Sequence, residues 1–218
     1  MRIVPAILSR TLDDVKDHLE HIKSVSTSVQ IDICDGAFGA LRTWIPNGKD
    51  ALPSGFSYEF DIMLNDWKIP VSQCLLLKPV SIIIHFDLFS DADIQLLIKM
   101  IRPYDIMLGV AVSNDKDIRF HIDMVHKIKK MYKKVFVQVM GIRHIGQQGQ
   151  PFDDKVPLRV LALKKEFKSL TIQVDGGVNT ATIKLLNDVG VETVVVGSAL
   201  FGEEDVKKAY DKLLSIVK

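Results

Sequence analysis

The sequence predicts a single-domain (β/α)8 barrel over residues 1–218, in which eight parallel strands alternate with helices. Three observations lead to this prediction. Short apolar runs rich in β-branched residues recur along the chain, amphipathic stretches with helical spacing separate them, and two of the last apolar runs end in glycine turns. Alternation alone does not show that the sheet closes, so an open, doubly wound sheet is the structural alternative.

The apolar runs are expected to form the strands. They are nearly continuous in hydrophobicity, as is typical of parallel strands that are covered on both faces. The runs are Arg2–Leu8, Ser28–Ile33, Ser57–Ile62, Ser81–Phe86, Ile106–Val112, Lys134–Met140, Leu170–Val174 and Glu192–Val196.

Apolar residues at helical spacing predict the helices between the strands. Gly190 follows one such stretch and is placed to end its helix. Residues 44–53 and 65–77 have the least regular pattern. The clearest helices are expected over residues 12–22, 94–101, 183–189 and 203–217.

The composition excludes several classes of function. Lys and Arg total 28 and Asp and Glu total 27, so there is no electrostatic basis for a nucleic-acid partner. No stretch approaches the ~18 apolar residues of a membrane span, and no signal peptide is visible, so we expect a cytoplasmic protein without a membrane partner. Cys34 and Cys74 form neither a disulfide framework nor a metal-binding pattern, which fits a reducing compartment.

Glycine turns near the C-terminus predict a phosphate site. One apolar run ends in Asp175-Gly176-Gly177, and the next ends in Gly197-Ser198. Backbone N–H groups at such turns bind phosphate, and the missing Cβ of glycine lets an oxyanion come close.

Two acids at strand ends are candidate catalysts. Asp32 should point into the barrel because side chains alternate along a strand, and Asp175 ends the seventh strand beside the glycine turns. The two strands lie apart around the barrel, so the carboxyl groups can face each other. This suits two-base chemistry, in which one carboxylate removes a proton from a carbon and the other returns it to the opposite face. The alternative is that each acid caps a turn, which is how we interpret Asp35 beside Gly36.

The loop over residues 140–152 is long and rich in glycine and glutamine. We interpret it as a lid, because long loops in small barrels are usually functional, and Arg143 within it is placed to meet phosphate. An ordinary exposed loop is the alternative.

Several short motifs follow one another along nearly the whole chain. They are Pro5–Ser9, Ile31–Gly36, Phe60–Leu64, His85–Asp87, Gly109–Ala111, Gly146–Phe152, Val174–Asn179 and Gly197–Ala199. In their order and spacing, these motifs resemble the ribulose-phosphate 3-epimerase family.

The resemblance implies a barrel that interconverts ribulose 5-phosphate and xylulose 5-phosphate. The family's acid and base match Asp32 and Asp175, without showing which is which. The implied ligand is a small phosphorylated ketose, and the implied assembly is a homo-oligomer. The implied phosphate and substrate contacts are Gly146, Gly149, Gln150, Gly176, Gly177, Gly197 and Ser198.

The resemblance also implies a divalent metal, often zinc, held by two His and the same two Asp. The family's ligand positions are matched here to Gln30, Asp32, Met63 and Asp175. An amide oxygen binds zinc weakly and a thioether sulfur prefers softer metals, so only the two Asp fit. The metal site therefore looks degraded and no cofactor is expected, with a divalent metal such as zinc as the alternative.

The expected function is a sugar-phosphate epimerase that works by proton transfer through an enediolate. Amide groups such as Gln30, Gln138 and Gln150 are interpreted as donors that partly replace the metal. The alternatives are a phosphosugar-binding barrel without catalysis and an isomerase or epimerase for another ketose phosphate. An aldol-type reaction ranks third, because no Lys stands at a comparable strand end.

Overall fold

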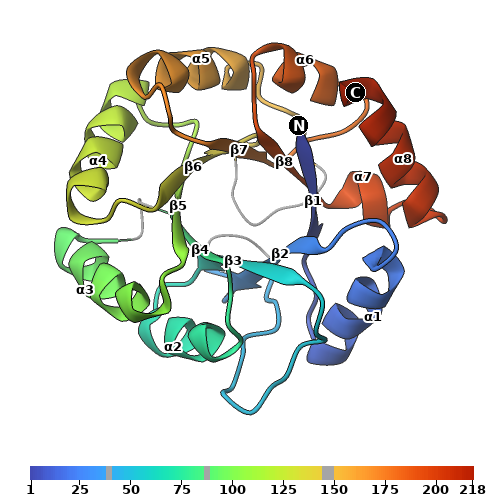
Figure 1. The fold of residues 1–218 in the computed structure, drawn as a ribbon, viewed down its shortest axis with the longest axis horizontal. Helices are drawn as coiled ribbons and strands as arrows, with labels where there is room; N and C mark the ends of the chain where they lie inside the picture. The colour runs from blue at the N-terminus through green and yellow to red at the C-terminus, as the bar shows by residue number, and fades with distance from the viewer. Residues whose placement is uncertain (38–40, 86–88, 144–149) are drawn as a thin grey trace.

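The computed structural model is a closed barrel of eight parallel strands surrounded by helices (Figure 1). It describes residues 1–37, 41–85, 89–143 and 150–218. The strands pair in chain order, and β8 closes the barrel by pairing with β1. The (β/α)8 prediction is therefore confirmed, and the open-sheet alternative is wrong.

Each predicted apolar run overlaps one strand, and β2, β3 and β7 end one residue later than predicted. Their core-facing residues are almost entirely buried, as expected for strands that are covered by helices on one side and packed into the barrel on the other. The strands are β1 Arg2–Ile7, β2 Ser28–Cys34, β3 Ser57–Met63, β4 Ser81–His85, β5 Met107–Val112, β6 Val135–Met140, β7 Ile172–Asp175 and β8 Thr193–Val196.

The helices form where apolar side chains recur on one face. In α1, for example, Val15, Leu19 and Ile22 are buried, and the Thr11 side chain caps the first turn by accepting from the Asp14 N–H. The helices are α1 Leu12–Ile22, α2 Lys68–Leu76, α3 Asp91–Ile101, the 3-10 helix η2 Arg102–Tyr104, α4 Ile118–Met131, α5 Val156–Glu166, α6 Ile183–Asp188, α7 Ser198–Phe201 and α8 Val206–Val217.

Two connections differ from the sequence expectation. Residues 65–77, which have an irregular pattern, contain the helix α2, whereas the described part of the β2–β3 connection, residues 41–56, contains no helix. The last helix begins at Val206, later than expected, because Asp205 caps it by accepting from the Lys208 N–H.

The largest part of the core lies between the strands and the helices. Inside the barrel, two smaller apolar clusters, one around Ile83 and Phe136 and the other around Val4 and Val195, share the space with buried polar residues. The interior is thus polar through much of its depth, which is where the site is built.

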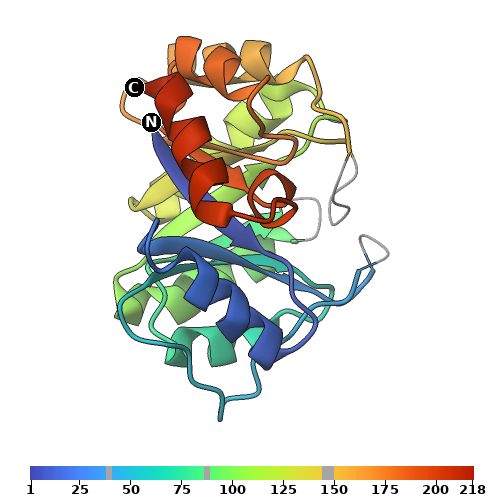
Figure 2. The same ribbon diagram turned by 90° about the vertical axis from the view of Figure 1, so that its right-hand side faces the viewer.

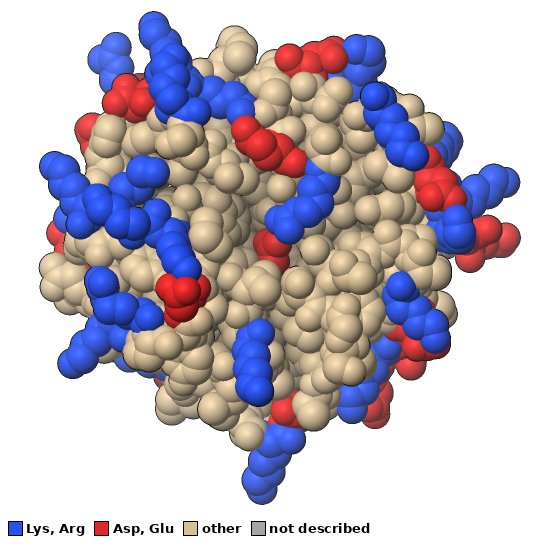
Figure 3. Space-filling view, viewed as in Figure 1, with Lys and Arg blue, Asp and Glu red and all other residues tan. Residues whose placement is uncertain are grey.

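The two termini lie near one another at the same end of the barrel (Figure 2). Figure 3 views the molecule down the barrel axis and shows basic and acidic side chains interspersed around the rim. Among the described residues, no helix is both long enough and apolar enough to cross a membrane.

Candidate active site

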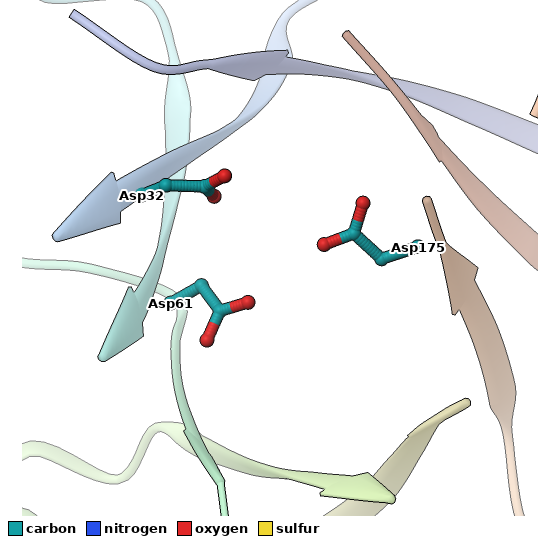
Figure 4. Close-up of side chains that lie close together, drawn as sticks. All are labelled: Asp32, Asp61 and Asp175. Atoms are coloured by element: carbon teal, nitrogen blue, oxygen red, sulfur yellow. The ribbon is translucent and has the colours of Figure 1, made fainter. Parts of the chain in front are cut away.

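Three carboxyl groups meet inside the barrel near the C-terminal ends of the strands. Asp32 on β2 and Asp61 on β3 are neighbours in the strand register, and Asp175 is the last residue of β7. One carboxylate oxygen from each lies within 4.8 Å of the others. Figure 4 shows Asp175 approaching from one side and the other two from the opposite side. The expectation that Asp32 and Asp175 face each other agrees with this geometry.

A cavity that the strand ends surround lies over Asp32 and Asp175. Asp32 and Asp61 are buried, and Asp175 is partly exposed. Asp32 and Asp175 line the cavity, together with apolar side chains and the two glycine turns. The remaining lining residues are Ala6, Leu8, Met63, Met140, Ile142, Gly176, Gly177, Val178, Val195, Gly197 and Ser198.

Two buried glutamine amides hold the carboxyl groups from below. The Gln30 Nε2 donates to Asp32 Oδ1 and to Asp175 Oδ2, both at 2.9 Å, so one NH2 group bridges the two predicted catalytic acids. The Gln138 Nε2 donates to Asp61 Oδ2 at 2.9 Å and to Asp175 Oδ2 at 3.3 Å. Both glutamines are fully buried, and their NH2 groups face the carboxylates instead of the cavity.

This placement corrects one sequence interpretation. Gln30 and Gln138 were expected to donate to the enediolate, but the amide hydrogens of each are directed at Asp side chains. Their effect on a bound substrate must therefore act through the acids. Gln150 lies beside a second, more exposed cavity, which Arg143 and Phe152 also line.

Two acids of this site have pKa values that are unusually high for carboxyl groups. Burial raises the pKa of Asp32 well above its ordinary value, and the charges of Asp175 and Asp61 raise it further, while the Gln30 hydrogen bond lowers it. Burial and the charge of Asp61 raise the pKa of Asp175 to about 7, against the opposing effects of Gln30 and His85. Asp32 and Asp175 therefore do not both ionise readily near neutral pH.

Asp61 was missed by the sequence analysis as a site residue. The residue of β3 that was matched to a metal-ligand position is Met63, two residues after Asp61. Met63 lies at the end of β3, where it pairs with Cys34 of β2. The signal for Asp61 was present, because an acid in the middle of a fully buried strand needs a partner. Its partner besides Gln138 is His85, whose Nε2 lies 2.8 Å from Asp61 Oδ1.

The two glycine turns border the same cavity. Gly176 and Gly177 have φ values of +102° and +67°, which side chains rarely adopt. The space is also restricted, because a Cβ on Gly176 would lie 2.9 Å from the Ile142 side chain. Gly141 donates to Asp175 O at 2.6 Å, so backbone contact fixes the end of β7 against β6.

The other predicted contacts fall into three groups. Gly197 and Ser198 line the cavity above the acids, as the phosphate prediction requires. Gly146 and Gly149 lie outside the described residues. Arg143 is largely exposed and pairs with Asp153 at 3.5 Å, so it is not among the residues that line the cavity over the acids.

Asp35 has the turn role that the sequence analysis gave it. Its Oδ1 accepts from the Ala37 N–H at 2.8 Å, and its Oδ2 accepts from the Asn65 N–H at 3.0 Å. It thereby joins the ends of β2 and β3 without facing the three acids.

The residues present do not fit the zinc set implied by the resemblance. Among the described residues, the three Asp form the one group of at least three His, Cys, Asp or Glu that could hold a metal ion, and this group offers only oxygen. The Gln30 and Gln138 amides point hydrogen atoms, not lone pairs, at these oxygens. Zinc favours nitrogen and sulfur ligands, whereas an all-oxygen set suits harder cations such as Mg²⁺ or Mn²⁺.

Comparison with known sequences shows the family. The model of the ribulose-phosphate 3 epimerase family matches residues 2–201. A ribulose-phosphate 3-epimerase from Bacillus subtilis is 24% identical, with 98% of each chain covered. One from Helicobacter pylori is 26% identical, covering 99% of this chain and 98% of that protein.

Comparison with solved structures shows the same fold at much lower identity. A 3-hexulose-6-phosphate synthase from Salmonella typhimurium superposes with a TM-score of 0.72 at 14% identity, covering 100% of this chain and 98% of that one. A protein named KGPDC from Streptococcus mutans gives a TM-score of 0.70 at 11% identity, covering 99% and 96%. The family match spans nearly the whole chain, and the chain belongs to the ribulose-phosphate 3-epimerase family.

Proposed function

We propose that this family member is an epimerase of a ketose phosphate, with ribulose 5-phosphate as the first substrate to test. The observation that carries the proposal is the pair Asp32 and Asp175, which reach the cavity from opposite sides of the barrel beside the glycine turns. Relatives across the full length of the chain are named ribulose-phosphate 3-epimerase, which supports the same substrate class.

The proposed reaction is a proton transfer at the carbon next to the ketone. One of the two Asp carboxylates removes the proton from one face, which leaves an enediolate. The other Asp, in its protonated form, returns a proton to the opposite face and so inverts the carbon. The reaction needs one acid ionised and one protonated, and the raised pKa values of both groups support such mixed states at neutral pH.

The enediolate oxygens need a hydrogen-bond donor to stabilise them, because this chain lacks the His ligands that the family uses to hold zinc. A carboxyl group that stays protonated at neutral pH can donate a hydrogen bond to an oxyanion, and burial is what keeps it protonated. Asp61 contributes by placing a third carboxyl group near the pair, where its charge raises the pKa of Asp32 and Asp175. His85 and Gln138 hold Asp61 in that position.

The phosphate end of the substrate is assigned to the two turns. Gly176 and Gly177 line the cavity beside Asp175 with backbone alone, and Gly197 and Ser198 border it on the adjacent strand end. Backbone N–H groups at such turns suit a phosphate ester. Gly146 and Gly149 stay predicted contacts.

The test is to mix the purified protein with ribulose 5-phosphate and follow xylulose 5-phosphate by NMR. Formation of xylulose 5-phosphate supports the proposal. Phosphate-ester binding without conversion would instead favour a phosphosugar-binding barrel or another ketose phosphate as the substrate, and further ketose phosphates would then be screened in the same assay.

Removal of divalent metal is expected to leave this turnover unchanged. The amide hydrogens of Gln30 and Gln138 already stabilise one oxygen of each acid, namely Asp32 Oδ1, Asp61 Oδ2 and Asp175 Oδ2. The measurement is the rate after dialysis against EDTA, with Zn²⁺, Mg²⁺ and Mn²⁺ added back separately. A large loss that one cation restores would contradict the metal-free reaction, and the identity of that cation would show which ligand chemistry the site uses.

A further inference from the structure

A second polar layer lies directly below the three acids inside the barrel. It contains Gln30 on β2, Glu59 on β3, Gln138 on β6 and Gln173 on β7, all of them buried. Their side chains are joined by hydrogen bonds across the barrel, and we call these four residues the amide layer. Such a connected set of buried polar groups has only a few arrangements in which every donor meets an acceptor.

Glu59 fixes the direction of hydrogen bonding at one edge of the layer. Its Oε1 accepts from the Arg2 guanidinium at 3.1 Å, and its Oε2 accepts from Gln173 Nε2 at 3.3 Å. Arg2 and Glu59 line a cavity at the N-terminal ends of the strands, where the Arg2 side chain is half exposed. A carboxylate bound to arginine can only accept, so Gln173 must turn its NH2 group, and not its carbonyl, toward Glu59.

The hydrogen bonds of Gln173 fix the orientation of Gln30 and Gln138, the two glutamines that hold the acids. Besides Glu59, its Nε2 faces Gln138 Oε1 at 2.9 Å and Gln30 Oε1 at 3.2 Å, so its two hydrogens serve three acceptor oxygens. The carbonyl oxygens of Gln30 and Gln138 both accept hydrogen bonds from Gln173. The NH2 groups of these two glutamines therefore face the acids. This is the arrangement seen in the contacts with Asp32, Asp61 and Asp175.

We propose that Glu59 and Gln173 are positioning residues that set the polarity of the amide layer, so that amide donors and not carbonyl oxygens face the three carboxyl groups. The consequence for turnover rests on the proposed epimerase function, whereas the polarity itself does not. Neither residue touches the cavity above the acids, so both act through Gln30 and Gln138.

The substitution Glu59→Gln is expected to reverse the layer. Arg2 would hold the carbonyl oxygen of the new amide, which places its NH2 group where Oε2 accepted from Gln173. Two NH2 groups would then face each other, so Gln173 would turn its carbonyl toward position 59. Gln30 and Gln138 would follow, and their carbonyl oxygens would point at the carboxylates that they now stabilise.

Two measurements test this proposal on Glu59→Gln. The first is the set of side-chain amide NMR signals of Gln30 and Gln138, which report the hydrogen bonds to carboxylate without any need for turnover. We expect them to shift away from their wild-type positions. The second is steady-state kinetics, in which we expect kcat to fall on the order of 10- to 100-fold with KM unchanged, as for other residues that orient a reacting group.

Thr193→Val is the matched control. Thr193 is buried next to Gln173 in the strand register and takes part in none of the amide contacts described above. This variant removes a hydroxyl group from the same depth of the barrel, so it is expected to keep both the amide signals and kcat.

The outcomes separate the two claims. Unchanged amide signals in Glu59→Gln would overturn the polarity, and shifted signals with an unchanged kcat would overturn its role in catalysis. If the wild-type protein had no epimerase activity, the proposed function would fail, and the amide signals would still decide the polarity. Equal shifts in Thr193→Val would also overturn the proposal, because the layer would then respond to any change at that depth.

Discussion

Replacing Asp175 by Asn is expected to abolish turnover of the ketose phosphate while leaving phosphate-ester binding intact. Loss of a positioned acid or base costs about 10²- to 10⁴-fold in rate, and no other described carboxyl group approaches the cavity from this side of the barrel. The substitution leaves the Gly176-Gly177 and Gly197-Ser198 backbone of the phosphate turns in place. The measurements are kcat for epimerisation and the Kd of a phosphate ester by calorimetry.

The matched control for this substitution is Asp35→Asn. Asp35 is also an acid at a strand end, but its oxygens accept backbone N–H bonds in a turn. We expect nearly normal turnover for Asp35→Asn and a severe loss for Asp175→Asn. Normal turnover in Asp175→Asn would show that the two-base mechanism is wrong.

The same Asp175→Asn variant is expected to be more stable than the wild type at pH 8, by about 1–3 kcal/mol. Burial and neighbouring charge raise the pKa of Asp175 to about 7, so the folded protein holds a proton that the unfolded chain releases at about pH 4. The folded state therefore binds more protons than the unfolded state between about pH 4 and pH 7, and its stability falls as the pH rises through that window.

Asparagine removes this loss because it cannot ionise. Its carbonyl oxygen can take the place of the Asp175 Oδ2, which accepts from Gln30 and Gln138. The measurement is urea unfolding at pH 5 and pH 8 for both proteins. The wild type should lose stability between these values and Asp175→Asn should lose less, whereas equal losses would show that Asp175 ionises normally in the folded protein.

Local sequence patterns were sufficient to predict the barrel and its two principal acids. Each strand lies in a nearly continuous apolar run, and this pattern follows from burial on both faces. Asp32 and Asp175 could be placed because side chains alternate along strands and barrel sites lie at the C-terminal ends. The irregular pattern over residues 65–77 hid the helix α2, because Ile69 and Leu76 are apolar but exposed, so the apolar residues of this helix do not lie on one face.

The role of Asp61 and the amide layer could not be predicted in the same way. Gln30 and Gln173 are separated by 143 residues in the chain and meet only because the barrel closes. Nothing in the neighbourhood of Gln138 indicates that its NH2 group serves Asp61 from across the barrel. Interactions of this kind depend on strand register, which sets which inward side chains share a layer.

The most direct test of the central claim is solvent deuterium incorporation into ribulose 5-phosphate, followed by NMR in chelated and metal-supplemented samples. We expect deuterium at carbon 3, together with xylulose 5-phosphate, in both samples. No deuterium in either sample, despite ligand-induced shifts in the protein spectrum, would contradict proton transfer by Asp32 and Asp175 on this sugar.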